Sequence, residues 1–228
     1  MNDMIRHRLL LTLLLLIGCA GSLARSLTAQ DYRMEPLSEA PPEALSADIV
    51  KLLSVEGVRV IRGEKSKFCD IWLRKELNPK ADFQATAEIV YPFVPGQLVG
   101  AIRYGRRGAD YRDQRIDRGV YTLRYAHQPV DGAHVGTSLT RDFLVLINAK
   151  HDQSGEELEY DSLTEHSAEA VGTSHPGMLS LQRIATDGDR KKMRHDGRHD
   201  WWIVPLSGCS GEQKAVHLDV VVVGFGEE

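Results

Sequence analysis

A polar segment between two predicted strands carries side chains that can bind a metal ion or a polar ligand. His127 lies at its start, and Asp131 and His134 follow within it. Arg141 closes the segment. Imidazole and carboxylate groups bind first-row metals, and long connections are often functional. The alternative is a polar crossover whose hydroxyl and carboxylate side chains satisfy their own backbone.

A second candidate is a stretch rich in arginine and tyrosine. Seven arginines lie between residues 103 and 124, against three aspartates, and tyrosines are interleaved with them. Guanidinium groups bind phosphates and carboxylates, and they also stack on aromatic rings. This stretch is therefore a candidate surface for an anionic ligand. Its candidate binding residues are Arg103, Tyr104, Arg106, Arg107 and Tyr111.

Residues 151–182 have the opposite charge. They contain seven acidic residues and neither lysine nor arginine. Two interpretations stay open for the basic and acidic stretches. They dock on one another within the molecule, or they form separate solvated faces, where ion pairs contribute little.

Two further histidine patterns favour ordinary structure over catalysis. His195 and His199 have the spacing of a helical metal site, but Gly197 and the apolar residues that follow predict a loop entering a strand. Ser174 and His175 are adjacent, so their side chains point apart rather than forming a dyad. The chain also lacks a phosphate-binding glycine loop, a nucleophile elbow and a His-Glu-x-x-His motif. These patterns therefore assign no reaction.

Strands are the elements that must position the candidate residues. From Gly57 onward, apolar or alternating runs are separated by Gly, Pro, Asn and Asp. Strands at this spacing predict a mainly β protein with a single β-sandwich or jelly-roll-like domain. The predicted strands are 57–62, 67–74, 83–91, 97–104, 119–126, 142–149, 200–206 and 215–223.

Two helices complete the predicted domain. Pro42 can begin a helix, and apolar residues follow at helical spacing, so a short N-terminal helix is predicted over 43–53. Ser162 and Glu165 fit a capping box at the start of an inserted helix. Gly172 is then expected to end that helix.

The N-terminus predicts export. Basic residues precede an apolar run at 9–17, which is too short to span a membrane and is typical of a signal peptide. The run leads to Cys19 in a pattern that resembles a bacterial lipobox, so we expect a lipid on Cys19. Cleavage after Ala24 or Ala29 and an uncleaved anchor are the alternatives. The predicted organisation is a signal peptide over 1–18, a flexible tether over 19–42 and a folded domain over 43–228.

Two cysteines, Cys69 and Cys209, remain beyond the predicted cleavage sites. An oxidising compartment favours a disulfide between them, which by loop entropy would contribute about 5 kcal/mol. The alternative is two separate buried thiols. Neither cysteine belongs to a Cys-x-x-Cys motif, so a redox role is not indicated.

Composition excludes several classes of function. The 228 residues include 28 basic and 32 acidic side chains, a balance that argues against general nucleic-acid binding. The hydrophobic content of 42%, with 20 Gly and 9 Pro, excludes a collagen-like chain and extensive disorder. No motif predicts a cofactor.

Four short segments resemble an uncharacterised family of exported bacterial proteins. They are Gly57–Gly63, Phe68–Leu73, Gly119–Tyr125 and Gln128–Gly132. The resemblance spans most of residues 57–223 and implies export and a single domain. Because no activity is known for that family, it implies no catalytic residue.

The sequence therefore predicts an exported, lipid-anchored binding or structural module in the periplasm or at the outer membrane or cell surface. Its expected partners are the membrane and either an anionic glycan or an envelope protein that docks on exposed strand edges. The alternative is a metal-assisted enzyme that uses His127, Asp131 and His134.

Overall fold

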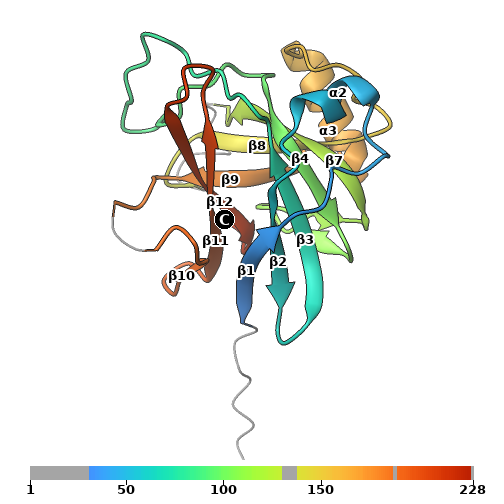
Figure 1. Ribbon diagram of the computed structural model, residues 1–228, viewed down its shortest axis with the longest axis vertical. Helices are drawn as coiled ribbons and strands as arrows, with labels where there is room; N and C mark the ends of the chain where they lie inside the picture. Colours follow the sequence, from blue (N-terminus) through green and yellow to red (C-terminus); the bar gives the residue numbers. More distant parts are fainter. Residues whose placement is uncertain (1–30, 130–137, 187–188, 227–228) are drawn as a thin grey trace, which may run out of the picture. The chain divides into compact units, whose positions relative to one another are not determined.

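The computed structural model of the protein describes residues 31–129, 138–186 and 189–226. Strands make up 41% of the chain and helices 10%. The two helices are α2 (Ala47–Leu52), near the start of the described residues, and the inserted α3 (Tyr160–Val171) (Figure 1). The predicted fold class, mainly β with a short N-terminal helix and one inserted helix, is confirmed.

One antiparallel sheet of ten strands forms the body of the protein, in the order β1-β2-β3-β4-β7-β8-β9-β12-β11-β10. A two-stranded hairpin, β5 (Gly108–Ala109) and β6 (Arg115–Ile116), lies between β4 and β7 in the chain. The large sheet consists of β1 (Tyr32–Leu37), β2 (Gly57–Arg62), β3 (Ser66–Leu73), β4 (Leu98–Tyr104), β7 (Gly119–His127), β8 (Asp142–Asn148), β9 (Met178–Gln182), β10 (Arg194–Asp196), β11 (Trp201–Cys209) and β12 (Ala215–Val223).

The sheet curls, so that its first strands pack against its last ones (Figure 1). Register shifts in β2, β4 and β11 mark bulges, which bend a strand and increase its twist. The ring of Tyr32 in β1 lies 5.5 Å from that of Trp202 in β11. Phe68 from β3 and Val204 from β11 belong to the same buried core. One curled sheet thus provides the two apolar layers of the core.

The other face of the sheet carries α3. Successive side chains of β8 point to opposite faces. Leu144 and Leu146 therefore join the main core, whereas Phe143 and Val145 pack in a second core with Leu163 of α3. The apolar residues of β8 thus provide the floor on which the helix rests.

The predicted strand over 83–91 is wrong. The hydroxyl of Thr86 accepts hydrogen bonds from the backbone N–H groups of Glu88 and Ile89, which closes a turn. Ala85 and Ala87 are exposed. The middle of the alternating pattern consists of Ala85 and Ala87, whose small side chains offer little apolar area to bury, so a local side-chain turn is formed instead.

The predicted tether over 19–42 is wrong in its last part. Residues 32–37 form β1, which pairs with β2. Just beyond it, the backbone carbonyl of Glu39 accepts a hydrogen bond from Nε1 of Trp72 at 2.8 Å. The compact unit begins at Tyr32 rather than at residue 43, because strand pairing and buried contacts fix this polar segment. The predicted signal peptide and Cys19 lie outside the described residues.

Both helices form, with different ends from those predicted. α2 covers only 47–52, and the Ser46 hydroxyl caps it by accepting the N–H of Ile49 at 3.3 Å. α3 begins at Tyr160, so Ser162 lies within the helix and the predicted capping box is wrong. Gly172 ends α3 in the left-handed conformation, with φ of 69°, as expected for a C-terminal glycine.

The expected disulfide between Cys69 and Cys209 is not present, because both thiols are free. Cys69 lies in β3 with its side chain inside the main core, and burial raises the pKa of its thiol well above the usual value. Cys209 lies at the exposed end of β11. The two residues belong to strands that are not neighbours in the sheet. A buried, protonated thiol such as Cys69 is chemically inert.

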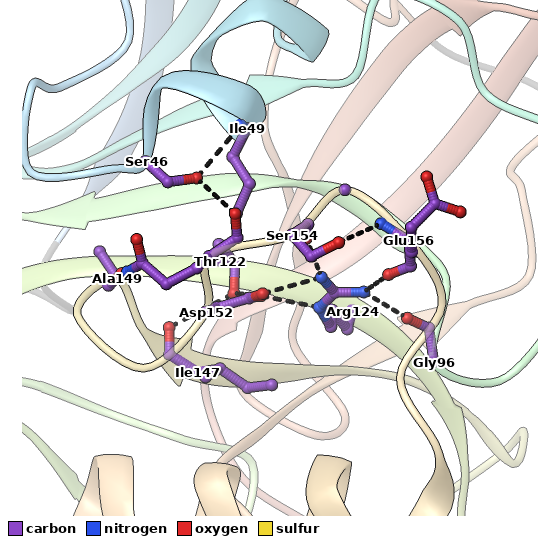
Figure 2. A network of polar contacts seen from close by, with 12 residues as sticks. Ser46, Ile49, Gly96, Thr122, Arg124, Ile147, Ala149, Asp152, Ser154 and Glu156 are labelled. Atoms are coloured by element: carbon purple, nitrogen blue, oxygen red, sulfur yellow. Dashed lines mark hydrogen bonds and ion pairs between the residues drawn. The ribbon is translucent and has the colours of Figure 1, made fainter.

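A buried ion pair between Arg124 of β7 and Asp152 fixes the connection that follows β8 (Figure 2). Their side chains are 0% and 1% exposed. Nε and Nη2 of Arg124 donate to the two carboxylate oxygens at 2.7 and 2.8 Å. The remaining N–H groups donate to backbone carbonyls of Gly96, Ser154 and Glu156. All five guanidinium donors therefore have acceptors.

This network links three parts of the chain. Gly96 precedes β4, and Ser154 and Glu156 belong to the segment that leads into α3. The Ser46 hydroxyl at the start of α2 donates to the carbonyl of Gln153 at 2.9 Å, so α2 is attached to the same segment. The pair is a contact between the basic and the acidic stretch, as one of the two interpretations of these stretches requires.

We predict that Asp152→Asn lowers the free energy of unfolding by about 3–5 kcal/mol, because the change leaves the charge of Arg124 buried without its counterion. Chemical denaturation of the wild type and the variant measures the difference. Asp161→Asn removes the same charge from an exposed position on α3 and is the matched control, with a change within about 0.5 kcal/mol. Equal effects of the two substitutions would contradict the assigned role of the buried pair.

Candidate functional site

A cavity of about 270 Å³ lies where α3 meets β7 and β8, and we call it the α3 cavity. Its apolar lining includes Phe143, Val145, Leu163 and Met178. These residues belong to the second core, so packing on three elements holds them in place. A larger hollow of about 390 Å³ lies beside β2, β3 and β11, but Cys209 is the only predicted site residue that it contains.

Polar side chains from four segments line the α3 cavity. Arg112 comes from the β5–β6 hairpin, His127 from the end of β7 and Thr164 from α3. Ser174 and His175 come from the connection between α3 and β9. An apolar floor with a few convergent polar groups is the usual form of a small-molecule site. The cavity therefore combines a floor for an apolar group with cationic and hydrogen-bonding groups for a polar one.

His127 belongs to a buried polar network at the end of β7. The Tyr125 hydroxyl lies 2.9 Å from Nε2 of His127 and donates to the Asp142 carboxylate. That carboxylate also accepts the N–H of Val90 at 2.8 Å. Burial lowers the pKa of His127 and raises the pKa of Asp142, although hydrogen bonds to the carboxylate oppose the second shift. The network thus holds a neutral imidazole at the edge of the α3 cavity.

Arg141 and Gln128 close the base of the polar segment that the sequence singled out. Arg141 donates from Nε and Nη2 to the carbonyl of Gln128 at 2.9 and 2.8 Å. Gln128 returns a backbone hydrogen bond to Arg141 at 2.8 Å. Of the three predicted metal ligands, His127 lies near this closure, whereas Asp131 and His134 lie outside the described residues. The side chain of Arg141 thus joins the two described ends of the segment through the backbone carbonyl of Gln128.

The structure does not assemble the predicted Arg/Tyr face. Tyr104 lies in the main core and Tyr111 in the second core, because burial of large aromatic rings stabilises the fold strongly. Arg106 and Arg107 are exposed in the connection after β4. Arg103 is partly exposed and belongs to an ion-pair cluster with residues of this chain. The side chains of this stretch thus have separate surroundings.

That cluster joins two arginines to two carboxylates across β2, β3, β4 and the segment after β1. Arg103 donates to Asp70 at 2.9 Å and to Glu39 at 2.8 Å. Arg59 donates to the same carboxylates at 2.6 and 2.8 Å. Hydrogen bonds from Arg103 and Arg59 lower the pKa of Glu39 to about 2. Arg103 therefore stabilises the fold through internal partners.

The residues on the helical side of the cavity were not predicted from the sequence. Leu163 and Thr164 lie on α3, and Met178 begins β9. Apolar spacing on α3 could have identified Leu163 as a buried residue, but only the tertiary structure places it opposite β8. Thr164 and Met178 have no sequence signal that distinguishes them.

We predict that Glu39→Gln destabilises the protein at about pH 6 and less so at about pH 2.5. Because the folded pKa of Glu39 lies below the unfolded value of 4.5, its contribution is complete above that value and is lost as the pH falls towards 2. Denaturant unfolding of the wild type and the variant at both pH values measures the effect. Glu43→Gln removes the same charge from an exposed position and serves as the control. A difference between wild type and Glu39→Gln that does not change with pH would rule out this ion-pair contribution.

Comparison with known proteins gives no family for the chain. No protein-family model, curated protein or solved structure matches it. The resemblance of residues 57–223 to exported bacterial proteins stays a prediction. The function proposed below is therefore inferred from the geometry of the α3 cavity and from the sequence.

Proposed function

We propose that the protein is an exported, lipid-anchored binding module of the bacterial cell envelope, and that the α3 cavity binds a small anionic ligand. The observation that carries this proposal is the combination of an apolar floor with Arg112 and His175 at a single cavity. A guanidinium group favours carboxylates and phosphates, and it can bind either with two hydrogen bonds. The module thus recognises a ligand by one apolar and one anionic group.

The size of the cavity limits the ligand. At about 270 Å³ it lies near the lower end of the range of about 300–1,000 Å³ for small-molecule sites. Phe143 and Leu163 provide apolar contact at the floor. The ligand is therefore a small organic acid or phosphate, or the end group of a larger envelope glycan.

The anchor is proposed from the sequence. The basic N-terminus, the apolar run and Cys19 support export and lipidation. Within residues 31–129, 138–186 and 189–226, no helix is long and apolar enough to cross a membrane. A lipid on Cys19 would hold the folded unit close to the membrane surface.

Metal-assisted catalysis by His127, Asp131 and His134 has less support. Nε2 of His127 is hydrogen-bonded to the Tyr125 hydroxyl, so this nitrogen is already occupied. The other two residues lie outside the described part of the chain. A binding function is therefore the better proposal.

Ligand binding is tested by titrating the ¹⁵N-labelled protein with hexanoate and phenyl phosphate, with hexanol and phenol as uncharged counterparts. We expect the anions to shift the amide resonances of residues 160–164 and 174–178, and Arg112→Gln to weaken anion binding about tenfold, because a charged hydrogen bond is lost. Arg115→Gln is the matched control, because Arg115 lies in the same hairpin but does not line the cavity. Absence of these shifts, or equal effects of the two substitutions, would reject the cavity as the anion site.

Lipid anchoring is tested separately by expressing the full chain and Cys19→Ala in a bacterial host. We expect the wild type in the membrane fraction and the variant in the soluble exported fraction, because the lipidated thiol is removed. Cys209→Ser, which changes an exposed thiol on β11, should fractionate as the wild type does. Identical fractionation of wild type and Cys19→Ala would show that no lipid on Cys19 holds the protein.

A further inference from the structure

Three metal-ligating side chains converge beside the last turns of α3. His166 and Glu169 lie three residues apart on the helix, and His151 lies in the segment after β8. The ligand atoms of the three side chains all lie within 4.8 Å of one another. Nε2 of His151 is 3.4 Å from one oxygen of Glu169, and Nδ1 of His166 is 4.0 Å from the other. No other such group occurs in the described part of the chain.

The two imidazole nitrogens that face Glu169 lack hydrogen-bond partners. Nε2 of His151 and Nδ1 of His166 are buried atoms that make no hydrogen bond, although each lies within 4.0 Å of a Glu169 carboxylate oxygen. The rings are stacked, with centroids 5.9 Å apart and an angle of 25° between their planes. Burying a polar atom without a partner costs free energy, so such atoms require an explanation. A cation between the two rings and Glu169 would provide the missing partner for both nitrogens.

The donor set indicates which cation fits. Two imidazoles and one carboxylate form the protein half of many zinc sites, which leave a fourth position for water. With bonds of about 2.0–2.1 Å, the ligand atoms of a tetrahedral site are about 3.4 Å apart. The separation of 3.4 Å between His151 and Glu169 meets this spacing, whereas Nδ1 of His166, 4.0 Å from Glu169, has to move closer when an ion binds. Mg²⁺ and Ca²⁺ prefer oxygen ligands and are disfavoured.

The surroundings also favour a cation. The carboxyl end of a helix carries partial negative charge, and the last turn of α3 contains no basic residue. Residues 151–182 contain neither lysine nor arginine. Lys150, which precedes His151, is exposed. Glu169 is 53% exposed at its side chain, so the fourth position is open to water.

His151 is fixed by its neighbours. The backbone N–H of His151 donates to the backbone carbonyl of Asn148 at 2.8 Å. The next residue, Asp152, belongs to the buried pair with Arg124. The imidazole is therefore attached to a rigid point of the fold before any ion binds, which lowers the entropic cost of forming a site.

We propose that His151, His166 and Glu169 form a binding site for a divalent first-row transition metal ion, with Zn²⁺ the best match. None of the three residues lines the α3 cavity, so this site is additional to the proposed ligand-binding function. The sequence did not predict a metal site at these three residues.

The test uses the full chain, purified through a tag without histidine and stripped with EDTA. Isothermal titration with ZnCl₂ is expected to show one ion per chain, with no competition from excess MgCl₂. His151→Gln, His166→Gln and Glu169→Gln should each weaken binding more than about 100-fold, because loss of even an outer-shell partner costs about 10–100-fold. The double variant His195→Gln/His199→Gln is the matched control and should keep wild-type affinity. In the wild type, His195 bonds to Asp200 and His199 bonds to Asp196. The two imidazole rings stack on different tryptophans.

A second readout separates loss of the site from loss of the fold. Zn²⁺ should raise the melting temperature of the wild type and of the control, and should leave that of Glu169→Gln unchanged. Glu169 is half exposed, so its replacement by glutamine leaves the packing intact. Absence of Zn²⁺ binding by the wild type, or binding with wild-type affinity by all three single variants, would overturn the proposal.

Discussion

The buried pair of Arg124 and Asp152 is the interaction on which the functional part of the structure depends. A charge inside a protein is tolerated only when its hydrogen bonds are satisfied, and Arg124 has an acceptor for each of its five donors. Three of these acceptors are backbone carbonyls, so the guanidinium group determines the path of an irregular segment. Without it, the carbonyls of Ser154 and Glu156, between β8 and α3, would lose these donors.

The consequences extend to both proposed sites. The segment fixed by Arg124 leads into α3, which packs through Leu163 on Phe143 and Val145 of β8. That packing forms the floor of the α3 cavity. The same segment carries His151 next to Asp152 and brings it within reach of Glu169. Both the proposed anion cavity and the proposed metal site therefore depend on the attachment of α3 to the sheet.

Much of the sheet could be predicted from the sequence, because its strands have dense apolar or alternating patterns. β2 and β12 agree with the predicted ranges 57–62 and 215–223. The pattern failed where it lacked apolar volume, as at Ala85 and Ala87, and where a strand is polar, as in β1. Pairing with β2 and the contacts of Glu39 stabilise β1, and both come from residues distant in the sequence.

The sites were less predictable. His127 was a candidate from its place beside a long connection, but its partners Tyr125 and Asp142 follow from the register of β7 with β8. His166 and Glu169 have a helical spacing that could indicate a shared face. His151 lies outside the helix, and only the folded chain brings it to them. Local patterns thus predicted elements, whereas chemistry depended on contacts between elements.

The central claim is that the Arg124–Asp152 pair holds α3 on the sheet. Hydrogen exchange of individual amides in the wild type and in Asp152→Asn tests it most directly, because it locates the loss of protection. We predict that amides of α3 lose protection by a larger factor than those of β3 and β4, as the helix detaches while the core sheet persists. Loss of protection by the same factor in α3, β3 and β4, or unchanged protection of α3, would contradict the account.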